Sequence, residues 1–255
     1  MMTCVSKSLG SLVAGIAFLG VASDAKADCS RLPSHTELTN ALKAAVKPTG
    51  GPSNGGLDFN MWGTIVDRDG AVCAVAYSGA HRGDQFPISR VVSAQKAFTA
   101  NAVSLDGFAL STANLFSPTQ PGHSLFGIMA SNLMDPAVAY GGESGDQGTD
   151  KDAMLGKKLG GMIVFGGGLA LYDKSGVIGG LGVSGDSSCA DHNIAWRMRK
   201  ALGLDAVPGG VTPSKNDGII YDIANGVSKG GFGHPTCGGT ETEIALAIGA
   251  GTVAP

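Results

Sequence analysis

The chain has 255 residues and a net charge of −3, and 43% of its residues are hydrophobic, which is typical of a globular domain with a sizeable core. Its basic clusters are limited to Lys157-Lys158 and the run from Arg197 to Lys200, so we expect no nucleic-acid partner. No stretch after residue 27 reaches about 18 consecutive apolar residues, which predicts no transmembrane segment in the mature chain.

The first 27 residues have the layout of a secretory signal peptide. Lys7 supplies a positive charge, residues 9–22 form an uncharged apolar stretch, and Ala25-Lys26-Ala27 is a small-x-small cleavage site. We therefore expect residues 1–27 to be removed on export. The mature protein, residues 28–255, is then expected in the periplasm or as a secreted protein.

The first half of the mature chain reads as helix, hairpin and helix. A capping box is predicted by Ser34 and Glu37, which have the required three-residue spacing. Gly70 ends the turn Arg68-Asp69-Gly70 and is suited to a positive φ, which predicts a hairpin. In chain order we expect helix 36–46, strands 61–67 and 71–78, helix 88–104 and a helical stretch over 108–116.

The second half begins with a long polar segment. In chain order we expect a loop over 117–158 with at most one short helix, strands 168–173 and 177–183, and helix 187–202. The remaining residues, 205–255, read as a loop-rich C-terminal extension with one short element near 218–225. Because hairpins make antiparallel sheets that helices must cover, we expect an α+β domain at 28–204.

The four cysteines of the mature chain are Cys29, Cys73, Cys189 and Cys237. An even number in an exported protein indicates disulfides, and three pairings are open. Cys73 lies in an apolar run and is also compatible with a buried free thiol, whereas the pair Cys189–Cys237 is favoured. No C-x-x-C occurs, so zinc ribbons and covalent c-type heme attachment lack their motifs.

Several segments together resemble the GlcG/HbpS-like heme-binding family, which includes the C-terminal domain of PduO-type proteins. They are Val66-Asp67-Arg68-Asp69-Gly70, the helix segment at 93–100, and above all the second hairpin at 167–172 and 176–185. The resemblance covers roughly 35–204. It implies a central antiparallel β-sheet flanked by helices in α-β-α layers, a homo-oligomer, and a bound heme as in several members. It implies no single catalytic activity.

Two sequence motifs in the second hairpin are rejected as functional sites. Residues 180–185 match G-x-G-x-x-G and Asp205 follows 20 residues later, but the strand belongs to a hairpin and no parallel strand follows. We interpret these glycines as allowing close packing of helix on sheet. Residues 182–186 miss the nucleophile elbow by one position, and Ser184 or Asp186 is interpreted as a helix cap.

Heme iron needs only one or two axial ligands, and histidine is a common one. No H-E-x-x-H motif supports a zinc enzyme. Two segments combine a histidine with groups suited to a porphyrin, and Lys96 and Thr99 stand at positions similar to those of the family. The candidate heme-binding residues are His81, Arg82 and Phe86 in loop 79–87, His123, Phe126 and Met129 in 121–129, and Lys96 and Thr99 on the long helix.

Within these candidates, His81 and His123 are the expected iron ligands and Arg82 the expected partner of a propionate. The sequence therefore leads to an exported heme-binding protein, acting as a carrier or in a sensor or accessory role. Two alternatives stay open. One is an enzyme, with or without the help of heme, that uses the same pocket for a small-molecule substrate. The other is a ligand-free oligomeric scaffold.

Overall fold

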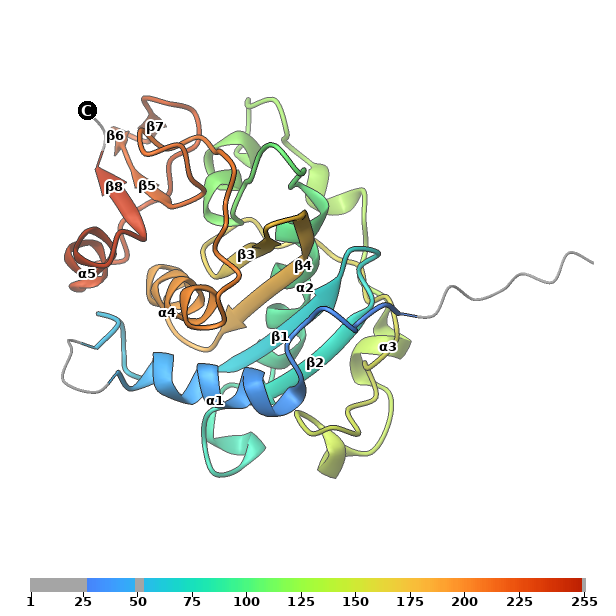
Figure 1. Ribbon diagram of the computed structural model, residues 1–255. Coiled ribbons are helices and arrows are strands. Elements are labelled where there is room, and N and C mark those ends of the chain that lie inside the picture. The colour runs from blue at the N-terminus through green and yellow to red at the C-terminus, as the bar shows by residue number, and fades with distance from the viewer. Residues whose placement is uncertain (1–26, 49–52, 254–255) are drawn as a thin grey trace, which may run out of the picture.

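The computed structural model describes residues 27–48 and 53–253 (Figure 1). The expected signal peptide, except for its last residue, lies outside these ranges. In the described part of the chain, no helix has both the length and the apolar character needed to cross a membrane.

A four-stranded antiparallel sheet forms the centre of the molecule (Figure 1). Its strands are β1 (Trp62–Asp67), β2 (Val72–Tyr77), β3 (Gly168–Asp173) and β4 (Gly176–Ser184). The order across the sheet is β2-β1-β4-β3. Both predicted hairpins are confirmed, and Gly70 in the first turn has a φ of 83°. The two hairpins join through β1 and β4, where Trp62 pairs with Ser184.

Helices cover both faces of this sheet. Helices α1 (His35–Val46) and α4 (Ser188–Ala201) pack on one face, where Leu38, Leu42 and Met198 share a core with the strands. Helix α2 (Ser89–Ala102) covers the other face with Val91, Ala94 and Ala97. The predicted α+β fold, with a central antiparallel sheet in α-β-α layers, is confirmed.

Two glycines of β4 allow α2 to lie directly on the sheet. A Cβ at Gly182 would stand 1.9 Å from the carbonyl oxygen of Ser93, and one at Gly180 would stand 2.2 Å from that of Ala97. Real Cβ atoms do not approach backbone oxygens so closely. The predicted packing role of these glycines is therefore confirmed.

The segment 108–116 is not the helix that its sequence suggested. It contains only the 3₁₀ turn Ala113–Leu115. Its backbone groups bond to distant segments instead, because the N–H of Ala109 donates to Gly209 (2.8 Å) and that of Thr112 donates to Gly168 (3.1 Å). These tertiary hydrogen bonds replace the helical pattern.

The long segment 117–158 contains the one short helix expected, α3 (Pro136–Tyr140), and several 3₁₀ turns. A buried ion pair fixes it to α2. The Arg90 guanidinium bonds to both oxygens of Asp152, with Nε to Oδ2 at 2.8 Å, and also donates to the carbonyl of Ala139 (2.7 Å). The segment thus completes the layer around α2, with Met154 and Leu159 in the same core.

The C-terminal extension is more ordered than its composition suggested. Its elements are β5 (Ile219–Tyr221), β6 (Ile223–Ala224), β7 (Val227–Ser228), α5 (Glu241–Ala247) and β8 (Gly251–Val253). The short element near 218–225 is confirmed, whereas helix α5 was missed. That helix buries Ile244 and Ala245 beside α4. A bidentate buried pair, Arg199 with Asp217 at 2.7 Å for both bonds, fastens the extension to α4.

Two disulfides connect Cys29, Cys73, Cys189 and Cys237. The favoured pair Cys189–Cys237 is confirmed and joins α4 to the extension. The interpretation of Cys73 as a free thiol was wrong, because Cys73 in β2 bonds to Cys29. The N-terminal segment is also held to β1, since Asp28 N–H donates to the Asp67 carboxylate (2.9 Å), and Leu32 packs against the core.

Candidate functional site

The first group of candidate residues lies in the loop between β2 and α2, at the surface. Loop 79–87 carries His81, Arg82 and Phe86, all exposed, and includes one 3₁₀ turn. The carboxylate of Asp84 accepts hydrogen bonds from the backbone N–H groups of Ala80 (2.8 Å) and His81 (2.9 Å). This carboxylate therefore holds the backbone on which His81 and Arg82 stand.

A small aromatic pocket opens beside this loop. The rings of Phe59 and Phe86 meet edge to face with centroids 5.4 Å apart, and a pocket of about 260 Å³ lies between them, residues 83–85 and Pro87. Phe59 is 41% exposed and Phe86 is 52% exposed, and Leu57 and Ile88 nearby in sequence are exposed too. Apolar side chains concentrated on a surface in this way indicate a binding surface.

Asp186 places Phe59 at this pocket. Its carboxylate accepts hydrogen bonds from the backbone N–H groups of Leu57 (2.8 Å) and Phe59 (3.2 Å), more than 120 residues away along the chain. The expectation that Ser184 or Asp186 caps the next helix was wrong, because the hydroxyl of Ser187 accepts from Ala190 N–H (3.2 Å) as the cap of α4. The Asp186 carboxylate accepts hydrogen bonds from the backbone at 57–59 instead of capping α4.

Lys96 lies in the interior rather than at the aromatic pocket. Its ammonium Nζ contacts Asp191 Oδ2 at 2.5 Å and donates to the carbonyl of Val183 at 3.0 Å, and both side chains of the pair are almost completely buried. The ring of Phe165 lies 4.9 Å from Nζ, a cation–π distance. This ion pair joins α2, β4 and α4 at one point.

Burial changes the titration of this pair. Desolvation lowers the pKa of Lys96, and desolvation raises the pKa of Asp191 to about 6, while the charge of each partner opposes its shift. The second oxygen of Asp191 accepts from the backbone N–H of Asp186 (3.0 Å). The ion pair is thus linked through Asp186 to the backbone behind Phe59.

Thr99 serves packing in this structure. Its hydroxyl donates to the carbonyl of Gln95 (2.7 Å) and accepts from the N–H of Ile163 (3.0 Å), and the residue is buried. Neither Lys96 nor Thr99 lines the pocket between Phe59 and Phe86.

His123, Phe126 and Met129 form a second exposed group, far from the first. The segment that carries them starts next to β3, since Thr112 N–H bonds to Gly168 and Ser117 N–H bonds to Gly233. Loop 79–87 follows β2, at the other edge of the sheet (Figure 1). The structure therefore does not bring the two candidate histidines into one pocket.

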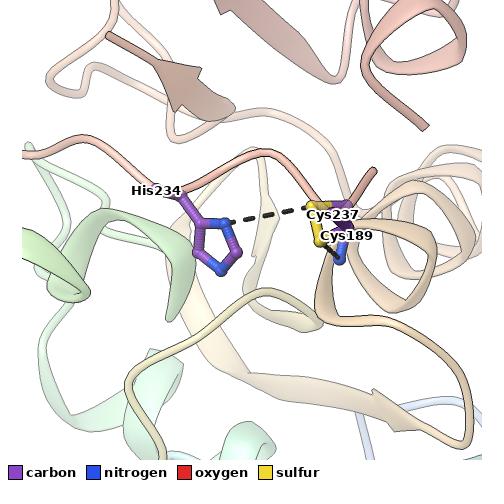
Figure 2. A group of neighbouring side chains, drawn as sticks. All are labelled: Cys189, His234 and Cys237. Atoms are coloured by element: carbon purple, nitrogen blue, oxygen red, sulfur yellow. Dashed lines mark hydrogen bonds between the residues drawn. A yellow bond between two sulfur atoms is a disulfide. The ribbon is translucent and has the colours of Figure 1, made fainter. Parts of the chain in front are cut away.

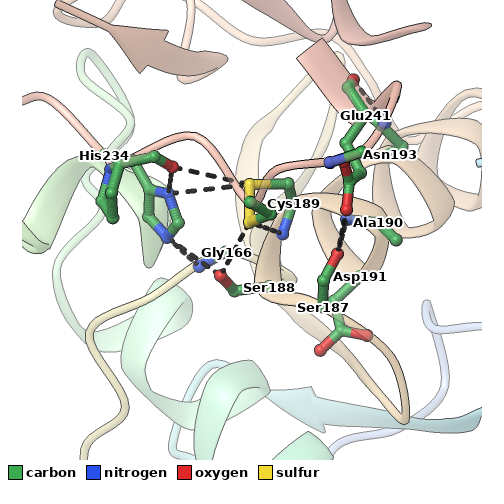
Figure 3. The surroundings of a disulfide bond; sticks show 12 residues. Gly166, Ser187, Ser188, Cys189, Ala190, Asp191, Asn193, His234 and Glu241 are labelled. Carbon is green, nitrogen blue, oxygen red and sulfur yellow. Dashed lines mark hydrogen bonds between the residues drawn. A yellow bond between two sulfur atoms is a disulfide. The ribbon is translucent and has the colours of Figure 1, made fainter. Parts of the chain in front are cut away.

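A buried polar cluster around His234 was not expected from the sequence. The Nε2 atom of this ring accepts from Gly166 N–H (3.3 Å) and lies 3.3 Å from Ser188 Oγ, while Nδ1 donates to the carbonyl of Pro235 (2.7 Å) (Figure 3). Desolvation lowers the pKa of His234 to about 4, so the ring is neutral at pH 7. The sequence signal that could have revealed this cluster is the three-residue spacing of His234 and Cys237 in an otherwise glycine-rich tail.

Comparison with known proteins gives one family match and several distant structures. The model of the family described as "Haem degrading protein HbpS-like" matches residues 57–199, more than half of the chain. No curated protein matches. Among solved structures, a PduOC:heme complex is 24% identical, covers 66% of this chain and 91% of its own, and has a TM-score of 0.45. The Klebsiella pneumoniae protein ORFY (22%, 67% and 90%, TM-score 0.44) and HbpS (19%, 66% and 86%, TM-score 0.39) are also similar.

Proposed function

The chain belongs to the HbpS-like family, and from that premise we propose that it is an exported heme-binding protein that acts as a heme carrier or in a sensor or accessory role. Two disulfides and a signal-like N-terminus support work outside the cytoplasm, because disulfides persist in oxidising compartments. The solved PduOC structure is named as a complex with heme, which supports heme as the ligand here.

The observation that carries the site proposal is the aromatic pocket on loop 79–87, the loop that also carries the exposed side chains of His81 and Arg82. A heme ligand needs a flat apolar wall, a cation for its propionates and a side chain for its iron. Phe59 and Phe86, whose rings stand at 88° to each other, offer one ring face as the wall, Arg82 offers the cation and His81 the imidazole. The donor set of this surface therefore fits heme.

The size of the pocket favours a heme carrier over an enzyme that encloses its heme in a closed active site. At about 260 Å³ it is smaller than the roughly 300–1,000 Å³ of ordinary ligand pockets, so it holds one edge of a porphyrin and leaves the rest accessible. A heme held in this way is within reach of a receiving protein. When bound, the heme supplies iron and its redox chemistry, and the chain's own part is to bind and orient the ring.

Hemin titration tests the assignment of His81. Loss of the imidazole in His81→Ala removes the iron bond and leaves the aromatic contacts, so we expect a shifted Soret band and at least a tenfold weaker affinity, or about 1.4 kcal/mol. His123→Ala is measured in parallel, because His123 is the other candidate iron ligand and is also an exposed loop histidine. Unchanged spectra and affinities in both variants would mean that neither histidine ligates the iron.

Arg82→Ala is expected to have a smaller effect. Arg82 is exposed and its Nη1 is 3.4 Å from Oε1 of Gln147, so solvent screens its charge. An exposed ion pair contributes about 0–1 kcal/mol, which is up to about fivefold in affinity. Arg82→Lys should keep most of that affinity, and a loss well above tenfold in either variant would contradict a screened contact.

The second candidate function is heme degradation, which the description of the matched family favours. Incubation of the hemin complex with ascorbate in air distinguishes the two. A carrier keeps its Soret band, whereas a degrading enzyme loses that band catalytically and releases a linear tetrapyrrole. Absence of any hemin binding would leave an enzyme that acts without heme or the ligand-free scaffold.

We also propose that the protein is exported and that it forms a homo-oligomer. We expect the mature chain to begin at Asp28 and to form a homo-oligomer, with the exposed residues Leu57 and Ile88 and the weakly charged second hairpin as candidate contact surfaces. Native mass spectrometry of the exported protein measures both. A chain that still carries residues 1–27 would contradict cleavage, and a monomer at all concentrations would contradict assembly.

A further inference from the structure

Three potential metal ligands converge where the C-terminal extension meets α4. The ligand atoms of Cys189, His234 and Cys237 all lie within 4.8 Å of one another, and no other such group of three occurs among the described residues (Figure 2). Cys189 belongs to the first turn of α4, and the other two come from the extension. In the oxidised protein the two sulfurs are bonded to each other.

The distances around this group suit a tetrahedral ion once the sulfurs separate. Bond lengths of about 2.3 Å to sulfur and 2.05 Å to nitrogen place a sulfur and a nitrogen roughly 3.6 Å apart, and two sulfurs roughly 3.8 Å apart. Nδ1 of His234 already lies 4.0 Å from the sulfur of Cys189. The main movement required is that the two sulfurs part from bonding distance, which side-chain rotation provides.

The surroundings are suited to two thiolates. The backbone N–H of Cys189 donates to the sulfur of Cys237 (3.3 Å), and Ser188 Oγ lies 3.6 Å from the same sulfur. Both sulfurs lie at the N-terminus of α4, a helix of 14 residues, where a negative charge is stabilised. These donors already contact the sulfurs in the oxidised protein (Figure 3).

A second contact allows the histidine to become a ligand. Coordination through Nδ1 requires the ring proton to move to Nε2, so that the bond to the Pro235 carbonyl and the bond that Nε2 accepts from Gly166 N–H are both given up. Ser188 Oγ, 3.3 Å from Nε2, can accept that proton's hydrogen bond. Histidine ligands of metals commonly donate their other N–H in this way.

We infer that reduction of the Cys189–Cys237 disulfide creates a binding site for a thiophilic divalent cation such as Zn²⁺, with Cys189, Cys237 and His234 as its protein ligands. A dithiol reductant gives two electrons and two protons to the disulfide, becomes a disulfide itself, and leaves two thiols. The cation then displaces the two thiol protons, and the fourth position is left for water or another ligand.

As a consequence, the C-terminal extension and α4 would be cross-linked in one of two alternative ways. The disulfide ties the extension to α4 under oxidising conditions, and the cation would tie the same two segments under reducing conditions. Cys237 is only partly buried, so a reductant can reach this bond from the side of the extension. The inference uses no heme and stands or falls independently of the proposed function.

Cobalt is the probe for this site, because Co²⁺ bound to thiolates has a sulfur-to-metal charge-transfer band and strong visible bands in tetrahedral geometry. The test protein is the mature chain with Cys29→Ser and Cys73→Ser, which leaves only the relevant pair. After reduction we expect one Co²⁺ per chain with both band types, displaced by Zn²⁺. The oxidised protein should show neither band.

Two matched variants complete the experiment. Cys189→Ser with Cys237→Ser keeps the other cysteine pair, and should give no thiolate bands after reduction. In the test protein, His234→Ala should weaken Co²⁺ binding at least tenfold, whereas His123→Ala should not. Circular dichroism follows the fold throughout. The inference is overturned if the reduced test protein lacks thiolate bands, if His234→Ala binds equally well, or if reduction unfolds the protein and Zn²⁺ does not restore it.

Discussion

His192 should make the folded protein sensitive to acid. It lies on α4 with no exposed surface, stacked beside Trp196 with ring centroids 6.2 Å apart. In the described part of the chain neither ring nitrogen has a hydrogen bond of normal geometry. Desolvation is the main cause that lowers its pKa from 6.5 to about 3, while the nearby charges of Asp217 and Arg199 act in opposite directions.

The size of the effect follows from proton linkage. Because the folded pKa lies below the unfolded one, the unfolded chain takes up the proton first, and stability is lost as the pH falls from 6.5 towards 3. Each unit corresponds to about 1.36 kcal/mol, so His192 alone should cost about 3 kcal/mol between about pH 7 and pH 4. Asp191, with its pKa raised to about 6, acts in the opposite direction in the same range.

A comparison of variants isolates His192 from these other groups. Urea unfolding of the wild type and of His192→Leu, at several pH values from about 7 to 4, gives the difference in unfolding free energy at each pH. We expect that difference to change by about 3 kcal/mol in favour of the variant as the pH falls. A difference for His192→Leu that is independent of pH would refute the reasoning.

Two further predictions concern packing and the buried charges. Gly182→Ala places a methyl group against a backbone carbonyl of α2 and should destabilise the fold by about 3 kcal/mol or more by urea unfolding, whereas Gly145→Ala, where a Cβ meets nothing within 4 Å, should change little. Asp152→Asn leaves the Arg90 guanidinium buried without its counter-charge and should cost about 3–5 kcal/mol, seen as a thermal midpoint lower by roughly 10 °C. Asp69→Asn, at an exposed pair, is its control.

Local chemistry made parts of the fold predictable. The turn at 68–70, the capping box of Ser34 and Glu37 and the apolar periodicity of the helices depend only on neighbouring residues, and all three are observed. The glycines of β4 could also be interpreted correctly, because a hairpin strand followed by a helix leaves them few roles. The helix predicted over 108–116 was wrong, because the backbone of this segment forms hydrogen bonds to residues distant in sequence.

The candidate site was predictable only within one loop. His81, Arg82 and Phe86 are close in sequence and stay together on the surface, so their association could be expected. The partner ring of Phe59 could not, because Asp186 holds it from a segment more than 120 residues away. The structure does not place His123 beside this loop, because the segment that leads to His123 starts next to β3 and the sheet order puts β2 and β3 at opposite edges.

By itself the sequence determined the two hairpins, the main helices, one of the two disulfides and the family, since these depend on short-range geometry or on local motifs. The tertiary structure decided which polar groups are buried. Lys96 meets Asp191 across 95 residues, and His234 meets the sulfur of Cys189 across 45. Burial and pairing of this kind arise only when helices close over a sheet, because desolvation depends on what the whole fold places around a side chain.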